Sequence, residues 1–155
     1  MTFLSGPGQK AYRVNTGKPR ATENAGTAYA ALEIAGGSLA TSSDATHCYD
    51  SDGIHWCHLI DPRTGRPINC PDEAGLQAGI ASVTLMGENA ALLDALGTAL
   101  CVMGPEEAVR RMNSQDERII MVLWRSDRTD YEVISTLPEG TWELLDPAYH
   151  HRQQE

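Results

Sequence analysis

The chain of 155 residues is poor in aromatic side chains and contains a single Phe. Aromatic residues make up 6% of the sequence, so aliphatic side chains must fill most of a hydrophobic core. Cationic residues are scarce too, because 12 Lys and Arg stand against 21 Asp and Glu and give a formal net charge of −9. No run of Lys or Arg makes a local basic patch, and this balance argues against nucleic acid as the main partner.

Long apolar runs are missing as well. The first eight residues, MTFLSGPG, contain neither a basic leader nor an apolar stretch that would span a bilayer, so we expect no signal peptide and no membrane segment. The four cysteines, at positions 48, 57, 70 and 101, form no CxxC pair, and we interpret them as reduced thiols. Reduced thiols favour a cytoplasmic setting but leave the compartment open.

The rest of the composition is that of an ordinary globular protein, with 41% hydrophobic and 21% charged residues. We expect an irregular N-terminal arm at residues 1–27, one domain at 28–142 and a polar tail at 143–155. The arm is rich in Gly, Thr, Asn and Pro and has little periodicity apart from a possible short strand at 11–14. An irregular stretch of that length indicates either a function or a partner surface.

Within the domain, strands and helices do not alternate regularly, which favours an α+β fold. We expect strands at 28–34, from 39, at 54–60 and at 82–86, helices at 89–103 and 105–112, and strands at 119–124 and 131–135. Gly104 and Pro105 are typical of a helix end followed by a helix start. The predicted fold is a mostly antiparallel sheet packed on one long buried helix and a short helix.

The long helix has one apolar stripe that predicts its buried face, formed by Leu92, Leu96, Ala99 and Met103 and flanked by Leu93 and Leu100. Asp94 and Thr98 are four residues apart and share a face roughly opposite this stripe, among small residues that leave room for a ligand. Carboxylate and hydroxyl oxygens suit a hard cation such as Mg²⁺. The alternative is a solvated Asp94 and a Thr98 that hydrogen-bonds back into its own helix, and the helix taken alone favours this alternative.

Residues 58–67, HLIDPRTGRP, are expected to be a strand end that leads into a tight turn. The Asp61 carboxylate can cap backbone N–H groups there, and the glycine of the turn is free to take a positive φ. Arg63 or Arg66 can hold a phosphate with its planar fork, and His58 can act as a general base near neutral pH. A hairpin turn with solvated arginines and a packed histidine is equally compatible with these residue types.

A further group, rich in His and Cys, is a competing candidate for a zinc site. It consists of His47, Cys48, His55, Cys57, His58 and Cys70. Zinc sites show pairs with spacings such as C-x₂₋₄-C or H-x₃₋₅-H, and neighbours on a strand point to opposite faces. Because the adjacent His-Cys and Cys-His pairs do not supply this spacing, we disfavour zinc. No thiol is placed beside a base as a catalytic nucleophile would be.

The 58–67 segment resembles the signature of the ApbE family, the FAD:protein FMN transferases. Three other segments resemble stretches of that family in the same order. Residues 39–44 (LATSSD) are similar to its A-T-S-G-D stretch, and residues 81–85 (ASVTL) to its S-V-T-V strand. Residues 93–104 (LDALGTALCVMG) are similar to A-D-A-L-A-T-A-L-F-V-M-G. The resemblance covers residues 30–137.

This resemblance implies an enzyme that binds FAD, cleaves its pyrophosphate with Mg²⁺ and transfers FMN to a Thr or Ser of an acceptor protein, with release of AMP. Asp94 and Thr98 would be the metal ligands, and His58 would be the catalytic base. Two segments would contact FAD, the first with Ser42, Ser43 and Asp44 and the second with Asp61, Arg63, Thr64 and Gly65. A metal ion would also explain how a chain of charge −9 holds a pyrophosphate.

Two departures from the family pattern matter. Ser43 stands where the family has Gly, and a side chain there is strained if the backbone needs a positive φ. The family's N-terminal half, with further FAD and metal contacts, has no counterpart here, so we expect a partner chain that carries it or a homodimer. The rival hypothesis is a non-catalytic flavin- or nucleotide-binding or interaction subunit. Many members of the family are exported, and any leader would belong to that other half.

Overall fold

The computed structural model describes residues 2–3, 11–19, 28–45, 47–112 and 118–152. Its helices are α1 (Ala90–Met103) and α2 (Pro105–Met112). Its strands are β1 (Thr2–Phe3), β2 (Tyr12–Gly17), β3 (Ala28–Ile34), β4 (Gly37–Ser43), β5 (Tyr49–Ser51), β6 (Ile54–Trp56), β7 (Ile60–Asp61), β8 (Arg66–Pro67), β9 (Ala78–Gly87), β10 (Arg118–Arg125), β11 (Tyr131–Ser135), β12 (Trp142–Leu144) and β13 (Tyr149–His151).

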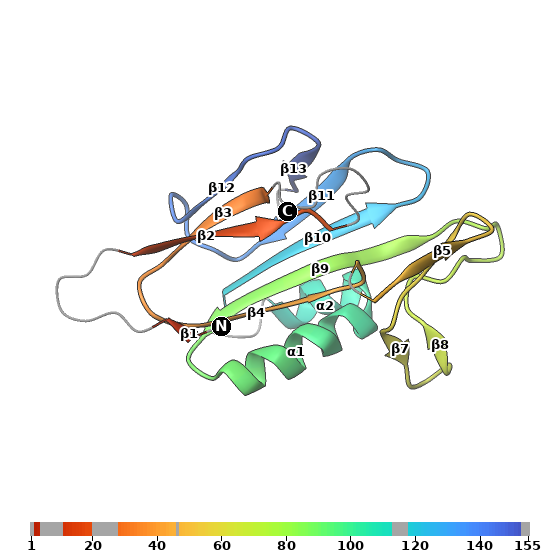
Figure 1. Cartoon of the computed structure of the whole chain (residues 1–155), viewed down its shortest axis with the longest axis horizontal. Helices are drawn as coiled ribbons and strands as arrows, with labels where there is room; N and C mark the ends of the chain where they lie inside the picture. Colours follow the sequence, from red (N-terminus) through yellow and green to blue (C-terminus); the bar gives the residue numbers. More distant parts are fainter. Residues whose placement is uncertain (1, 4–10, 20–27, 46, 113–117, 153–155) are drawn as a thin grey trace.

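Six strands form the main sheet, in the order β1-β4-β9-β10-β11-β13. All of its pairs are antiparallel except β11 with β13. A second, antiparallel sheet has the order β12-β3-β2. Two short hairpins, β5-β6 and β7-β8, complete the strands, and Figure 1 shows β5, β7 and β8 at one end of the molecule. The fold is therefore α+β with mostly antiparallel sheets, as predicted.

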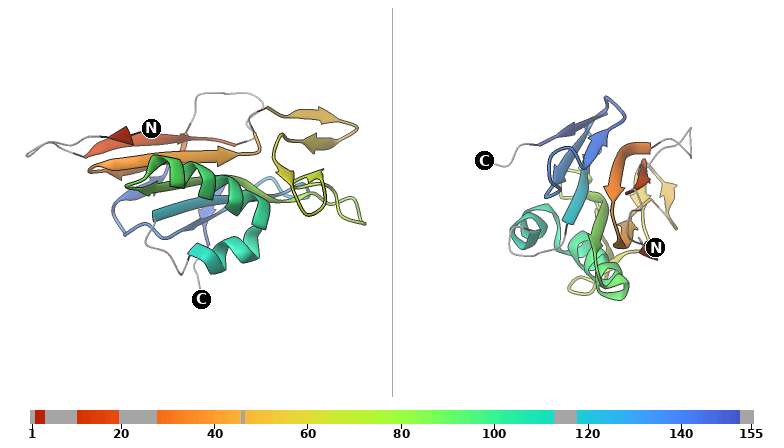
Figure 2. Two further views of the ribbon diagram at one scale, coloured as in Figure 1. Left: turned by 90° about the horizontal axis from the view of Figure 1, so that it is seen from below. Right: turned by 90° about the vertical axis from the view of Figure 1, so that its left-hand side faces the viewer.

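Hydrophobic cores lie on both faces of the main sheet. Val83 and Leu85 of β9 point to the helices and pack in the first core with residues such as Leu93 of α1. On the other face, Val122 of β10 packs in the second core with residues of the second sheet such as Tyr29. The molecule thus has three layers, with the helices, the main sheet and the second sheet stacked in that order (Figures 1 and 2).

The buried face of α1 differs from the predicted stripe. Its buried residues are Leu93, Gly97, Leu100 and Cys101. Leu92 is 53% exposed and Met103 is 37% exposed, so the centre of the predicted stripe is wrong, whereas its flanking residues Leu93 and Leu100 are buried. Apolar side chains surround this helix, and periodicity therefore does not single out one face. Asp94 and Thr98 lie beside the buried face, because Asp94 is two turns from the buried Cys101 along one line of the helix.

Both ends of the chain contain more regular structure than expected. β2 pairs with β3 along its length, and Thr16 of β2 donates a hydrogen bond to the Ala30 carbonyl at 3.0 Å. Near the C-terminus, β12 pairs with β3 and β13 pairs with β11, and Tyr149 is only 4% exposed. The possible strand at 11–14 is therefore confirmed, and irregular structure is the wrong expectation for the rest of β2 and for the C-terminal strands. Much of 1–27 lies outside the described residues, and the division into domains stays a prediction.

Among the helices that the structure describes, none combines the length and apolar character that a membrane span requires. The four cysteines are free, with Cys57 and Cys101 buried and the other two half-buried. Burial, together with the nearby Asp44 carboxylate, raises the pKa of the Cys101 thiol to about 12. This thiol is therefore a neutral core side chain at physiological pH.

Candidate functional site

Gly97 brings α1 into close contact with β4. A Cβ atom at this position would lie 2.8 Å from Ser42 Oγ and 3.1 Å from Leu85 Cδ1. Next to it, the Thr98 hydroxyl lies 3.2 Å from Ser42 Oγ. Thr98 also donates to the carbonyl of Asp94 at 3.4 Å, so Ser42 is the donor to Thr98 when that bond is made. Hydroxyls of the helix and the strand thus meet at the edge of the first layer.

Asp94 lies one turn before Thr98 on this edge and is exposed. Within the described ranges, its carboxylate makes no hydrogen bond or ion pair with another side chain. A carboxylate and two hydroxyls therefore face solvent together, contributed by Asp94, Thr98 and Ser42. Oxygen donors with few carboxylates fit Mg²⁺, which takes one or two carboxylates and completes its octahedron with water and substrate phosphates.

The signature segment is a hairpin and not one continuous strand. β6 ends before it, and β7 pairs with β8 across the turn, so the predicted strand at 54–60 is interrupted. The backbone N–H groups of Thr64 and Gly65 donate to the Asp61 carbonyl at 3.2 and 2.8 Å. Gly65 has φ of 69°, which confirms the predicted glycine turn.

Alternate side chains anchor this hairpin in the first core. Cys57, Leu59 and Ile68 are buried there. His58 lies between two of them and is held outward, so its ring is exposed. The His58 ring meets the His47 ring edge to face, with their centroids 5.4 Å apart. The hairpin therefore presents a solvent-facing imidazole.

Arg63 ties the signature turn to the end of α1. Its Nε and Nη2 atoms donate to the two carboxylate oxygens of Asp61 at 2.9 Å, and Nη2 also donates to the Val102 carbonyl at 3.0 Å. The hydrogen bonds from Arg63 lower the pKa of Asp61, and those to Asp61 raise the pKa of Arg63, because each stabilises the charged partner. Val102 lies four residues after Thr98, or about 6 Å along the helix axis.

The two arginines of the turn therefore differ in availability. Arg63 is engaged by Asp61 and by the helix. Arg66 is exposed, and its guanidinium makes no hydrogen bond or ion pair with any side chain in the part of the chain that the structure describes. Its backbone N–H donates to the Thr64 hydroxyl at 3.2 Å. Of the two candidates for a phosphate contact, Arg66 is the one whose guanidinium is not already held by a carboxylate.

The residues at the end of β4 that are expected near FAD do not share a face. Ser42 points to α1, whereas Ser43 donates to the Ala81 carbonyl at 3.0 Å and lines a cavity between the two sheets. Asp44 is fully buried and accepts a hydrogen bond from Asn69 Nδ2 at 2.7 Å. Ser43 does not have a positive φ, so serine in place of glycine causes no backbone strain here.

Asn69 fixes the segment after the signature hairpin, a role that no sequence motif indicates. Its amide donates to Asp44 and to the Ile80 carbonyl, at 2.7 and 3.1 Å. Its own backbone has φ of 58°. A Cβ atom at Gly79 would lie 1.8 Å from Asn69 Oδ1, so glycine is required where β9 passes this side chain. The buried carboxylate thus anchors the hairpin segment to the main sheet.

The His and Cys residues considered for zinc are dispersed. In the described ranges, no group of three or more His, Cys, Asp or Glu side chains is arranged to hold a metal. His55 instead contacts the Asp50 carboxylate at 2.9 Å and the Asp44 carbonyl at 3.2 Å. Cys57 is directed at backbone carbonyls of its own hairpin.

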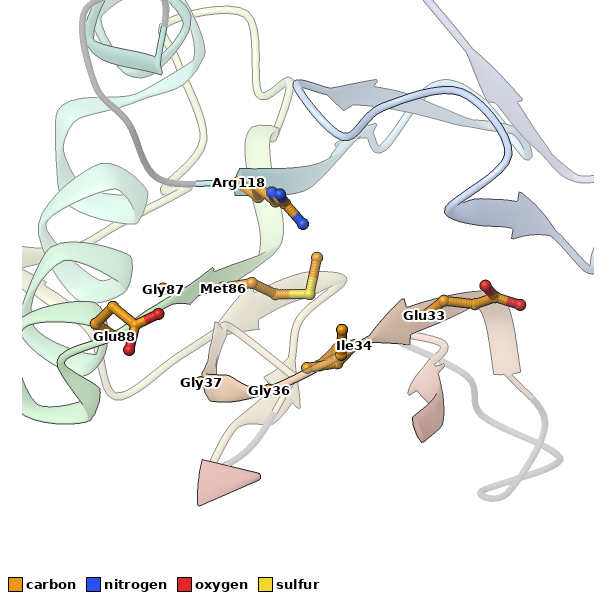
Figure 3. A pocket seen from close by; sticks show the side chains of 9 residues that line it. Glu33, Ile34, Gly36, Gly37, Met86, Gly87, Glu88 and Arg118 are labelled. Carbon is orange, nitrogen blue, oxygen red and sulfur yellow. The ribbon is translucent and has the colours of Figure 1, made fainter. Parts of the chain in front are cut away.

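A separate cavity of about 560 Å³ opens beside the β3–β4 turn. Figure 3 shows Arg118 and Met86 pointing into it, with Glu33 and Glu88 on opposite sides. Its walls include Gly36 and Gly37 and none of the residues expected to bind metal or FAD. This cavity is therefore distinct from the site formed by Asp94, Thr98 and Ser42.

Comparison with known proteins places these features in a family. The sequence profile of the ApbE family matches residues 2–123. The chain is 34% identical over 116 residues to the FAD:protein FMN transferase of Escherichia coli (strain K12), which covers 75% of this chain and 30% of that protein. It is 42% identical over 72 residues to the FAD:protein FMN transferase of Rhodobacter capsulatus, covering 46% of this chain and 12% of that protein.

Solved structures agree. The ApbE protein from Thermotoga maritima superimposes with a TM-score of 0.61 at 27% identity, covering 77% of this chain and 35% of that one. The chain thus spans about a third of the length of the Escherichia coli and Thermotoga maritima relatives. Because the family profile matches well over half of its residues, this chain belongs to the ApbE family.

Proposed function

We propose that this chain forms the metal-ligand and signature-turn portion of a Mg²⁺-dependent FAD:protein FMN transferase. The observation that supports this most strongly is the exposed Asp94 carboxylate one turn before Thr98 on α1, with the Ser42 hydroxyl of β4 beside Thr98. Arg63 joins the signature turn to the same helix. Family relatives that carry this activity in their names support the same reaction class.

In the proposed reaction, a Thr or Ser hydroxyl of an acceptor protein attacks the phosphorus of the FMN moiety of FAD. A new P–O bond forms, the pyrophosphate P–O bond to the AMP moiety breaks, and AMP leaves. His58 takes the proton of the hydroxyl. Asp94 and Thr98, supported by Ser42, would hold Mg²⁺, which supplies charge stabilisation at the pyrophosphate oxygens.

The remaining FAD contacts divide by position. In our proposal Thr64 and Gly65 form the loop against FAD, and the open guanidinium of Arg66 takes a phosphate oxygen. Asp61 and Arg63 shape this loop through their mutual ion pair. Ser43 and Asp44 act indirectly, because the first faces the second sheet and the second is buried.

We further propose that the rest of the site comes from the part of the family fold that lies beyond the matched region. The chain corresponds to 30% of the Escherichia coli relative, and its single carboxylate and two hydroxyls leave positions of a magnesium octahedron open. That part can belong to the same polypeptide, to a partner chain or to a second copy. The alternative function, a flavin- or nucleotide-binding subunit without catalysis, rests on this same partial coverage.

The test incubates the chain with FAD, Mg²⁺ and a Thr-containing acceptor peptide, with and without a polypeptide that carries the rest of the family fold. Intact-mass spectrometry should show the peptide gaining the mass of FMN, and chromatography should show AMP. Asp94→Asn should abolish the gain, whereas Glu106→Gln, at an exposed acid of α2, should leave it unchanged.

FAD binding, followed by flavin fluorescence with and without Mg²⁺, separates the two functions. Tight Mg²⁺-dependent binding that requires Asp94, without modified acceptor under any combination, would favour the binding subunit and sink the transferase. Modification that survives Asp94→Asn would refute the assigned metal ligand.

A further inference from the structure

A second cavity of about 300 Å³ lies between the two sheets, on the face of the main sheet away from α1. Strands β2, β3, β4 and β9 enclose it. Hydroxyl side chains dominate its polar lining, and they belong to Thr16, Tyr29, Thr41, Ser43, Ser82 and Thr84. Val14 and Leu39 add apolar wall.

Several of these hydroxyl protons are already used. Thr16 donates to the Ala30 carbonyl and Ser43 to the Ala81 carbonyl, each at 3.0 Å. Thr41 and Thr84 share one hydrogen bond of 2.9 Å, so one of the two keeps its proton free. The cavity therefore retains donors that the protein itself does not satisfy.

Among the described residues, the buried hydroxyls of Tyr29 and Ser82 have no partner at full hydrogen-bond distance. The two residues are only 1% and 3% exposed. Burial raises the pKa of Tyr29 to about 12, although the nearby Thr16 and Ser82 hydroxyls act in the opposite direction. The phenol therefore stays a proton donor at neutral pH. Buried polar groups without partners are rare in native proteins and destabilise the fold.

The charge at the rim is balanced. Lys18 lines the cavity and forms an ion pair with Asp146. No unpaired cation among the described lining residues awaits an anion. Surplus O–H donors without surplus positive charge select a neutral ligand that brings acceptor oxygens.

We propose that this cavity binds a small neutral molecule that presents carbonyl oxygens, such as a lactam or amide heterocycle, to the hydroxyls of Tyr29 and Ser82. Apolar atoms of the ligand would pack against Val14 and Leu39. The site lies on the opposite face of the main sheet from Asp94 and Thr98, so it does not depend on the proposed flavin transfer.

The test uses uracil as the neutral carbonyl probe and inorganic phosphate as the anionic one. Amide NMR spectra of the full chain should show saturable uracil shifts at the cavity residues and none with phosphate. Tyr29→Phe and Ser82→Ala should each weaken uracil binding about fivefold, the loss of one hydrogen bond. Tyr131→Phe, in the neighbouring tyrosine stack but outside the cavity, should not.

Urea unfolding without probe gives an independent readout. If the two hydroxyls lack partners, Tyr29→Phe and Ser82→Ala leave the unfolding midpoint unchanged or raise it, and both lose the stabilisation that uracil gives to the unaltered chain. Preferential binding of phosphate overturns the proposal, as does the absence of saturable uracil binding. An unchanged uracil affinity in both variants also overturns the proposal, since the hydroxyls then serve only to hold water.

Discussion

Arg63 joins two parts of the molecule through the shape of its guanidinium group. Its Nε and Nη2 atoms donate to the Asp61 carboxylate, and Nη2 also donates to the Val102 carbonyl at the end of α1. A lysine carries the same charge but cannot make these contacts together, because its ammonium is a single point donor. The arrangement of the signature turn on α1 therefore depends on the planar fork.

We predict that Arg63→Lys loosens the turn. The amides of Thr64 and Gly65, which donate to the Asp61 carbonyl, should exchange with deuterium faster in this variant. Arg66→Lys is the matched control, since the Arg66 guanidinium has no partner in the described structure, and it should leave both amides unchanged. Equal protection in Arg63→Lys would show that the fork is dispensable.

The same ion pair predicts a pH dependence. Arg63 lowers the pKa of Asp61 below its ordinary value of 3.8. The stabilisation that follows is fully present above pH 3.8, and it is lost as the pH falls through the lower native value. A carboxyl carbon NMR titration should therefore find the Asp61 pKa below 3.8, and Arg63→Ala should return it towards 3.8. An unchanged titration in the variant would contradict the assigned cause.

Gly97 is the residue at which packing and helix propensity oppose each other. Alanine gains about 1 kcal/mol of helix propensity. Its Cβ, however, would lie 2.8 Å from Ser42 Oγ, and overpacking costs about 1–3 kcal/mol. We predict that Gly97→Ala lowers the free energy of unfolding by about 1 kcal/mol and separates the Ser42 and Thr98 hydroxyls.

Urea unfolding measures the first effect of Gly97→Ala, and weakened Mg²⁺-dependent FAD binding would report the second. Ala95→Gly, at an exposed position of α1, measures how much the free energy of unfolding falls when helix propensity alone is lost. A stabilised Gly97→Ala variant with unaltered FAD binding would mean that β4 shifts freely.

At the scale of elements, the sequence predicts the bounds of α1 correctly but does not predict which side of the helix is buried. Its bounds follow from local signals, because Asn89 caps the first turn and Gly104 with Pro105 ends the helix. Its orientation depends on its packing against β9, which directly precedes it, and against β4, which lies far away in sequence. Apolar residues all round α1 leave that choice to tertiary contacts, and the close approach at Gly97 decides it.

This orientation predicts opposite outcomes for two adjacent leucines. Leu93 is 1% exposed, so Leu93→Ala should lower the free energy of unfolding by about 2–5 kcal/mol. Leu92 is 53% exposed, so Leu92→Ala should change it by no more than about 0.5 kcal/mol. Urea denaturation of the two variants decides the matter, and a larger effect at Leu92 would restore the stripe that the sequence favours.

The strands show the same division between local and distant information. The 131–135 strand and the 105–112 helix were predicted at their observed bounds, because their patterns are local. The motif order predicted the signature turn and the Asp94–Thr98 pair. The Arg63 contact with Val102 and the Asn69 contact with Asp44 bridge 39 and 25 positions, and no periodicity encodes them.

For the whole molecule, the second core is closed by residues from both ends of the chain. Tyr149 of β13 stacks on Tyr29 of β3 and on Tyr131 of β11, with ring centroids 4.9 and 4.6 Å apart. Because β13 runs parallel to its neighbour, the chain must cross the sheet before it returns. The C-terminal sequence is mostly polar and does not predict that one of its tyrosines is a core residue.

We therefore predict that the C-terminal region is required for global stability. Tyr149→Ala should lower the free energy of unfolding by about 3–5 kcal/mol, as for other large buried aromatics. His150→Ala, at the exposed neighbour, should change it by no more than about 0.5 kcal/mol. Circular dichroism in urea gives both values, and a small effect at Tyr149 would show that β13 is an accessory strand.

The contact between Gly79 and Asn69 restricts the order in which this molecule can change. A side chain at 79 collides with the Asn69 amide, which is itself held by Asp44 and by the Ile80 carbonyl. A side chain at position 79 therefore fits only after Asn69 has been replaced by a smaller residue. If position 79 changes first, its side chain clashes with Asn69. Glycine at 69 is the natural intermediate, because the backbone there has a positive φ. Positions 69 and 79 are therefore coupled, and a substitution at 69 has to come before one at 79.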